Sequence, residues 1–127
     1  MKAKKIHCLL SLSLLLLACY QPVARAHAVV TDYSLKMAPI RAHQADKVSL
    51  NFNSKIELGL SQVFLVSKGD QLSPLEIAKG NRQGQMIITI PALTPGDYAL
   101  KMKVFAADGH LTEDVIHFTV APLTAAP

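Results

Sequence analysis

Large apolar residues recur at every second position in three segments of the chain, at residues 48–52, 98–104 and 116–120. Successive side chains of a strand point to opposite sides, so a period of two predicts strands that bury one face and expose the other. An amphipathic helix needs apolar spacings of three and four, which these segments lack. We therefore predict an all-β protein with antiparallel sheets.

Two more continuous apolar runs, residues 62–66 and 86–90, are also predicted to be strands. Residues 54–60 are expected to form a single helical turn at most. Turn-forming residues separate the strands at 68–70, 73–74, 79–81, 94–97 and 108–110. About seven short strands in about 100 residues predict a small antiparallel immunoglobulin-like β-sandwich of Greek-key type, with a cupredoxin-like barrel as a close variant. Tyr98 directly follows a turn, where its hydroxyl is expected to bond back to the chain at a sheet corner.

The first 26 residues have the layout of a secretory signal peptide. Three lysines lie near the start, an apolar run covers residues 8–18, and the small-residue pattern A-R-A ends at Ala26. The apolar run is too short to span a bilayer comfortably. We expect cleavage after Ala26, export from the cytoplasm, and a mature domain of residues 27–120 with a short tail of residues 121–127.

Removal of this segment changes the charge and the cysteine content. It takes away four of the 13 Lys and Arg residues and leaves nine, equal to the nine Asp and Glu residues. A near-neutral domain has no charge-based reason to bind nucleic acid or an anionic membrane. Cys8 and Cys19 also leave, so we expect no disulfide and no thiolate ligand. A metal site must then use His, Asp, Glu or Met.

A second interpretation of the same segment stays open. Residues 16–19 read L-L-A-C, which resembles a lipoprotein signal in which Cys19 is lipidated and becomes the first residue. This cleavage would place His27 inside a tethered segment and remove its free amine.

The residues that suggest metal chemistry are Asp108 and His110, which lie two positions apart just after a predicted strand. In an extended segment they would project to the same side and reach one ion together. A polar turn that closes a hairpin is the alternative for this spacing. His27, at the start of the mature chain, is the candidate for a third ligand.

The chain resembles the CopC family of periplasmic copper-resistance proteins over essentially all of residues 27–120. The segments that carry the resemblance are residues 27–30, 48–52, 60–66, 94–98 and 108–110, in this order and spacing. The resemblance implies a small β-sandwich that binds one Cu(II) with an N-terminal histidine, here His27, assisted by Asp108 and His110.

Copper chemistry agrees with this set of residues. A chain-terminal histidine offers both its amine and an imidazole nitrogen to one ion, and His110 would add a third nitrogen in a T-shaped arrangement called a histidine brace. Cu(II) favours such tetragonal sites with nitrogen and oxygen ligands, and Asp108 would add an oxygen or orient a water. Copper must compete with protons for the amine, whose reference pKa is near 8, so affinity should fall as the pH is lowered.

The chain departs from the family pattern at several positions. Family members often carry Phe-Ser-Glu with a carboxylate near the copper, whereas residues 52–54 here read F-N-S. A methionine-rich loop that binds Cu(I) in some members corresponds to residues 67–75, which contain no Met, so we predict no Cu(I) site. Met102 replaces a strand Trp, and Leu111 replaces the Pro that usually follows the second histidine.

The remaining histidines and methionines have simpler interpretations. His43 lies in a polar stretch and is expected in a solvated loop, and His117 should point away from the core. Met37, Met86 and Met102 are scattered along the chain and are expected to serve packing.

The sequence favours a non-enzymatic carrier or buffer of Cu(II), expected to be monomeric, that passes copper to an inner-membrane copper transporter. The transporter is implied by the family alone. One alternative is a copper-dependent oxidase or oxygenase, because a histidine brace resembles the site of lytic polysaccharide monooxygenases. Absence of Trp and of an aromatic platform argues against a polysaccharide partner. The other alternative is a metal-free scaffold domain on a lipid anchor.

Overall fold

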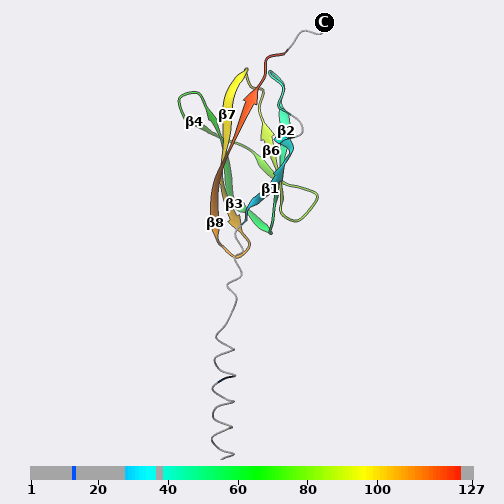
Figure 1. Cartoon of the computed structure of the whole chain (residues 1–127), viewed down its shortest axis with the longest axis vertical. Helices are drawn as coiled ribbons and strands as arrows, with labels where there is room; N and C mark the ends of the chain where they lie inside the picture. The colour runs from blue at the N-terminus through cyan, green and yellow to red at the C-terminus, as the bar shows by residue number, and fades with distance from the viewer. Residues whose placement is uncertain (1–12, 14–27, 37–38, 124–127) are drawn as a thin grey trace, which may run out of the picture.

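The computed structural model describes residue 13, residues 28–36 and residues 39–123. The elements in this part of the chain are β1 (Val30–Tyr33), the 3-10 turn η1 (Ser34–Lys36), β2 (Asp46–Phe52), β3 (Ile56–Ser67), β4 (Gln71–Pro74), β5 (Ile77–Lys79), β6 (Gln85–Ile90), β7 (Gly96–Ala106) and β8 (Leu111–Val120). The strands form two four-stranded sheets, ordered β1-β2-β6-β5 and β4-β3-β7-β8. The sheets pack against each other as two layers (Figure 1).

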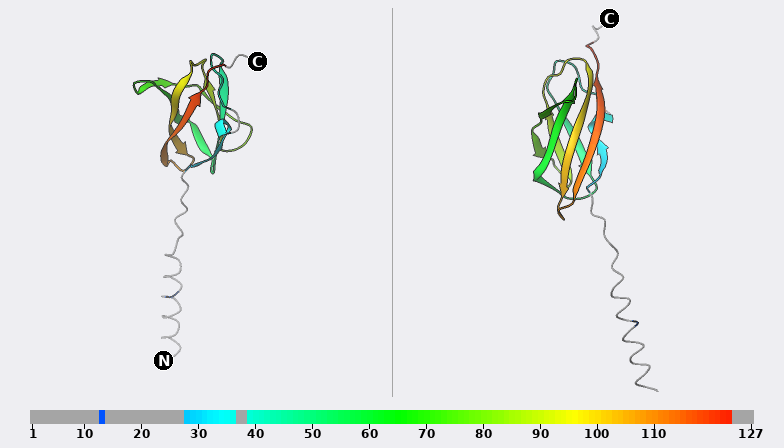
Figure 2. Two further views of the ribbon diagram at one scale, coloured as in Figure 1. Left: turned by 45° about the horizontal axis from the view of Figure 1, so that its top comes forward. Right: turned by 90° about the vertical axis from the view of Figure 1, so that its left-hand side faces the viewer.

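Every strand pair is antiparallel, and the chain crosses between the sheets after β2, β4 and β6. Hairpins connect β3 to β4, β5 to β6 and β7 to β8. Figure 2 shows β3, β7 and β8 side by side in one sheet. An isolated parallel bridge between Arg41 and Ala121 lies outside the named strands. The predicted all-β sandwich is therefore confirmed.

The predicted alternation determines which side chains form the core. In β2, Val48, Leu50 and Phe52 are buried, while Ser49 and Asn51 between them are half-buried. The same pattern buries alternate residues of β6 and β7. The largest side chains in this core with almost no exposure are Leu50, Met86, Ile88, Ile90, Leu100 and Met102. Burial of these apolar side chains between the sheets is the main force that holds the two layers together.

The prediction of a helical turn at residues 54–60 is wrong, because β3 already begins at Ile56. Ile56 pairs with Ala106, and the register shifts between Glu57 and Gln62. The buried Ser61 hydroxyl stabilises this irregular stretch, since Ser61 Oγ donates to the carbonyl of Glu57 (2.7 Å) and accepts from the amide of Phe105 (3.1 Å). The sheet thus accommodates a bulge in β3, and this bulge interrupts the alternation of apolar and polar residues that would mark a strand in the sequence.

The predicted break at residues 73–74 is also wrong, because Pro74 ends β4 and pairs with Phe64. A proline is tolerated there because β4 is an edge strand. β1, β4 and β5 were not predicted by residue range, and the described residues contain eight strands where about seven were expected. All three are short, with four, four and three residues.

The expected sheet-corner bond of Tyr98 is confirmed. Its hydroxyl donates to the carbonyl of Thr94 at 2.8 Å, and its ring stacks on Phe118 with centroids 5.8 Å apart. This corner lies at the β7 end that pairs with Val120. No helix among the described residues has the length and apolar character that a membrane crossing requires.

Candidate metal centre

The turn between β7 and β8 brings Asp108 and His110 together. One carboxylate oxygen of Asp108, Oδ2, lies 2.7 Å from His110 Nδ1. The other, Oδ1, accepts the backbone amide of His110 at 3.0 Å. Gly109 has φ of 89°, a conformation that favours glycine, and its amide donates to the carbonyl of Ala106 at 2.9 Å. The carboxylate therefore fixes both the backbone and the ring of His110.

The expected proximity of Asp108 and His110 is confirmed, but its physical cause differs from the prediction. Residues 107–109 form a turn rather than an extended segment. The side chains meet because the aspartate folds over its own turn and bonds two residues ahead, as aspartates commonly do. The hairpin-turn and metal-ligand interpretations of D-x-H are thus compatible, since the turn itself orients the imidazole.

This geometry suits a metal-binding histidine. A ring that donates its Nδ1 proton to a carboxylate has its tautomer and orientation set, and a metal bound by the same ring would take Nε2. The side chain of His110 is 59% exposed and that of Asp108 is 33% exposed, so an ion from solvent can reach this end of the molecule. An imidazole nitrogen and a carboxylate oxygen are both donors that Cu(II) accepts.

His27 lies outside the described residues, but the next residues, Ala28 and Val29, lie at the same end of the sandwich as the Asp108–His110 turn. Ala28 is buried in the core, and the amide and carbonyl of Val29 both bond to Asn53. Lys55 follows Asn53 by two positions, and its carbonyl accepts the amide of Ala107 at 3.0 Å. In Figure 1 the β7–β8 turn lies at the lower end of the sandwich, opposite the end marked C. Residues 28–29 and 107–110 are thus linked through one short turn.

Other acidic side chains near the turn have separate roles. Glu113 pairs with Lys103 at 3.7 Å, and Asp114 accepts the amide of Val115 at 2.8 Å. Within the described ranges, no group of three or more His, Cys, Asp or Glu residues is arranged to hold a metal ion. Among the described residues, Asp108 and His110 thus form a contacting pair of candidate site residues and are not part of a larger cluster of this kind.

The other residues considered from the sequence lie apart from this turn. His43 is exposed in the segment before β2, with φ of 59°, and His117 is exposed on β8. Met86 and Met102 are fully buried in the core, whereas Met37 lies outside the described residues. These positions agree with the solvated and packing roles predicted for the four described residues.

Sequence reasoning missed the positions of Asn53 and Ser54. The sequence shows only that residues 52–54 lack a carboxylate, whereas in the structure the side-chain oxygen of Asn53 accepts the backbone amide of Val29. Ser54 Oγ is buried and has no hydrogen-bond partner among the described residues. A hollow of about 190 Å³ lies beside these residues. The strand pairing, which no sequence signal revealed, brings Val29 beside Asn53.

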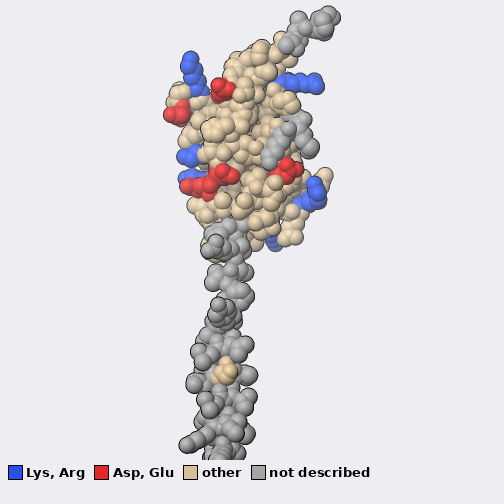
Figure 3. Space-filling view, viewed as in Figure 1, with Lys and Arg blue, Asp and Glu red and all other residues tan. Residues whose placement is uncertain are grey.

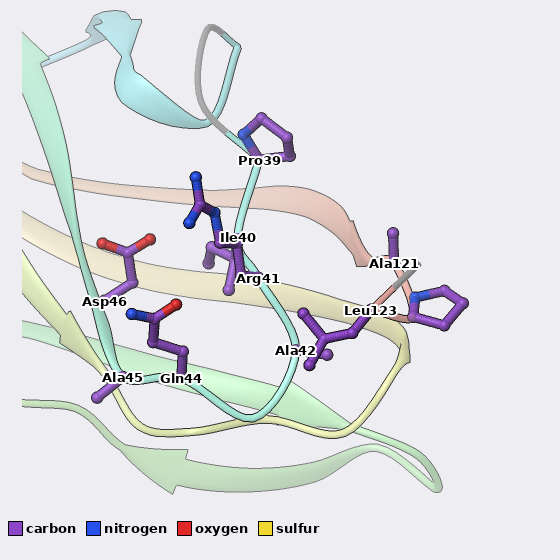
Figure 4. A pocket seen from close by; sticks show the side chains of 10 residues that line it. Pro39, Ile40, Arg41, Ala42, Gln44, Ala45, Asp46, Ala121 and Leu123 are labelled. Carbon is purple, nitrogen blue, oxygen red and sulfur yellow. The ribbon is translucent and has the colours of Figure 1, made fainter. Parts of the chain in front are cut away.

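A larger hollow of about 720 Å³ lies at the opposite end, between residues 39–46 and residues 121–123. Figure 4 shows Arg41, Gln44 and Asp46 on one side of it and Leu123 on the other. None of the predicted metal ligands lines it. The face shown in Figure 3 carries both acidic and basic side chains.

Comparison with known proteins now identifies the family. A family model described as the CopC domain matches residues 33–121, which is more than half of the chain. The chain belongs to the CopC family. No match to a curated protein was found.

Two solved structures share the CopC fold with this chain. CopC from Methylosinus trichosporium OB3b is 24% identical, with a TM-score of 0.65, and the match covers 80% of this chain and 100% of that protein. PcoC from Escherichia coli, described as a methionine-rich copper resistance protein, is also 24% identical, with a TM-score of 0.55 and coverage of 75% and 99%. The Asp108–His110 turn of this CopC-family chain therefore lies on a fold shared with these two proteins.

Proposed function

We propose that this CopC-family chain is a non-enzymatic Cu(II) carrier or buffer in the periplasm, with a role in copper homeostasis or resistance. The observation that carries the proposal is the 2.7 Å contact between Asp108 and the His110 ring, at the end of the sandwich where the described chain begins. Family membership and the description of PcoC as a copper resistance protein support copper as the ion. Copper is the cargo of the protein in this proposal.

The proposed site residues are His27 and His110 as direct ligands and Asp108 as the carboxylate that holds the His110 ring, with one Cu(II) per mature chain. His27 would supply its amine and an imidazole nitrogen, and His110 its Nε2 atom. Asp108 holds the His110 ring and adds negative charge close to the ion, which favours the binding of a divalent cation. Nitrogen and oxygen donors select Cu(II), whereas Cu(I) prefers thioether or thiolate ligands.

The proposal includes the processing of the chain. Residues 1–26 act as a cleaved signal peptide, residues 27–120 form the copper-binding domain and residues 121–127 form the tail. The mature monomer would deliver copper to an inner-membrane transporter. The mass of the exported protein tests the first step, because a mass that begins at His27 supports the proposal and a lipidated mass that begins at Cys19 contradicts it.

Copper binding is tested by single substitutions in the mature chain. His110→Ala and His27→Ala should each lower Cu(II) affinity more than the loss of an outer-shell partner does, which costs about 10–100-fold, because each removes one imidazole donor from the ion. Affinity is measured by competition with a chelator of known strength. His117→Ala is the matched control, since His117 is exposed on the same hairpin. Unchanged affinity in either of the first two variants would overturn the ligand assignment.

A further inference from the structure

Val29 and Asn53 form a reciprocal pair just beyond the last paired residues of β1 and β2. The amide of Asn53 donates to the carbonyl of Val29 at 3.0 Å. In return the amide of Val29 donates to the side-chain oxygen Oδ1 of Asn53 at 2.8 Å. The adjacent rung of the ladder is Val30 with Phe52, so Asn53 extends this antiparallel pairing by one residue with its side chain in place of its carbonyl.

From Val30 onward the segment is held by pairing with β2 and by packing of Val30 against the core, whereas residues 28–29 lie ahead of these contacts. The side chain of Val29 is 49% exposed, and Thr31 and Asp32 are exposed as well. Ala28 is buried, but it contributes only a methyl group. Chain ends tend to fray unless hydrogen bonds or docking hold them, so the two bonds to Asn53 have a large share in holding residues 28–29.

The turn that contains Asn53 also contacts the hairpin that carries His110. The carbonyl of Lys55 accepts the amide of Ala107, the residue before Asp108, at 3.0 Å. Ile56 then pairs with Ala106 at the start of β3. Residues 53–55 therefore bond on one side to the chain start and on the other side to the Asp108–His110 turn.

From this arrangement we infer that Asn53 is a positioning residue for copper binding, which fixes the chain start at a set distance from His110. The inference rests on the proposed function, in which the residue ahead of Ala28 is a ligand. A site whose donors are held in place before the ion arrives binds more tightly than one that must order them on binding. Asn53 thus acts through the backbone of Val29 and does not touch the ion.

The test uses the mature chain and compares Asn53→Ala with Asn53→Asp. Alanine removes the acceptor for the Val29 amide, whereas aspartate keeps an oxygen at the same position. Asn51→Ala is the control, because Asn51 lies two residues earlier and its side chain bonds Gln85 at 3.2 Å instead of the chain start. Two readouts are needed: hydrogen exchange of the Val29 amide without copper, and Cu(II) affinity together with the Cu(II) electron paramagnetic resonance spectrum.

We expect Asn53→Ala to accelerate exchange of the Val29 amide by at least about 10-fold and to weaken Cu(II) binding by about 10–100-fold, as loss of an outer-shell partner does. Its copper spectrum should differ from that of the wild type. Asn53→Asp should restore protection, spectrum and wild-type or tighter affinity. Asn51→Ala should resemble the wild type in all readouts.

Different failures separate this inference from the proposed function. If the wild type itself binds no copper, the proposed function is wrong. If the wild type binds copper but Asn53→Ala has the same affinity and spectrum, only the role of Asn53 is wrong. If Asn53→Ala does not fold, the Asn53→Asp variant decides the question. Weak Cu(II) binding by Asn53→Asp in spite of a protected Val29 amide would contradict the inference.

Discussion

At the scale of single residues, one carboxylate determines the geometry of the candidate site. Both carboxylate oxygens of Asp108 contact His110: Oδ1 accepts its backbone amide, and Oδ2 lies beside Nδ1 of its ring. A neutral amide in its place would keep the shape but remove the negative charge beside the imidazole. Charge-assisted hydrogen bonds of this kind are stronger than neutral ones.

Asp108→Asn should therefore lower Cu(II) affinity by about 10–100-fold, the usual cost of losing a carboxylate that supports a metal-binding histidine. Competition titration with a chelator measures the change. Asp114→Asn serves as the control, because the Asp114 carboxylate lies in the same hairpin and accepts the adjacent backbone amide of Val115. Equal affinity in Asp108→Asn and the wild type would show that the carboxylate does not act on copper.

At the scale of elements, the two ends of the β7–β8 hairpin differ in structure. The end near His110 carries the exposed turn, whereas the opposite end is closed by the Tyr98 hydroxyl and its ring contact with Phe118. The two strands remain paired from Gly96 with Val120 to Phe105 with Leu111. A change at the tyrosine corner should therefore affect stability without affecting copper binding.

Tyr98→Phe removes the bond to the Thr94 carbonyl but keeps the aromatic ring. The free energy of unfolding should fall by about 1 kcal/mol, the typical net contribution of one hydrogen bond, as measured by chemical denaturation. Cu(II) affinity should stay at the wild-type value. Loss of copper binding in a fully folded Tyr98→Phe protein would mean that the two ends of the hairpin are coupled.

The elements also show which parts of the structure could be predicted from the sequence. The alternating segments that became β2, β7 and β8 were recognisable because burial of one face imposes a period of two. β4 was not, because all four of its residues are exposed and no burial pattern marks it. β1 and β5 are too short to show a period, and the bulge in β3 interrupts its alternation.

For the site, local spacing predicted the meeting of Asp108 and His110, because both belong to one turn. The role of Asn53 depends on the pairing of β1 with β2, between residues 24 positions apart in the chain. A single sequence carries no direct record of such a contact. Expectations that concern His27 and the signal segment remain predictions.

At the scale of the whole molecule, a single core between two sheets supports the site at one end. Met102 lies within this core with 1% exposure, and Met86 is fully buried. Buried thioethers pack against neighbouring side chains and are not accessible to an ion. The methionines in the described part of the chain thus contribute to stability, and the predicted lack of a Cu(I) site remains to be tested.

Met102→Ala should lower the free energy of unfolding by about 2–5 kcal/mol, because it leaves a cavity in the core. Met102→Leu conserves volume and should cost less than about 1.5 kcal/mol. Denaturation measures both. Cu(I) titration of the wild type and of Met102→Leu should show equally weak binding, and tight Cu(I) binding that is lost in Met102→Leu would contradict the packing role.

The central claim is that the mature chain binds one Cu(II) through its free N-terminal histidine and His110. The most direct measurement compares Cu(II) binding by the chain that begins at His27 with binding by the same chain preceded by Ser-Gly-Ser, using native mass spectrometry and chelator competition. The account predicts one tightly held copper for the first protein and a large loss of affinity for the second, because the extension moves the amine away from the His27 imidazole. Equal copper affinity in the two proteins would contradict it.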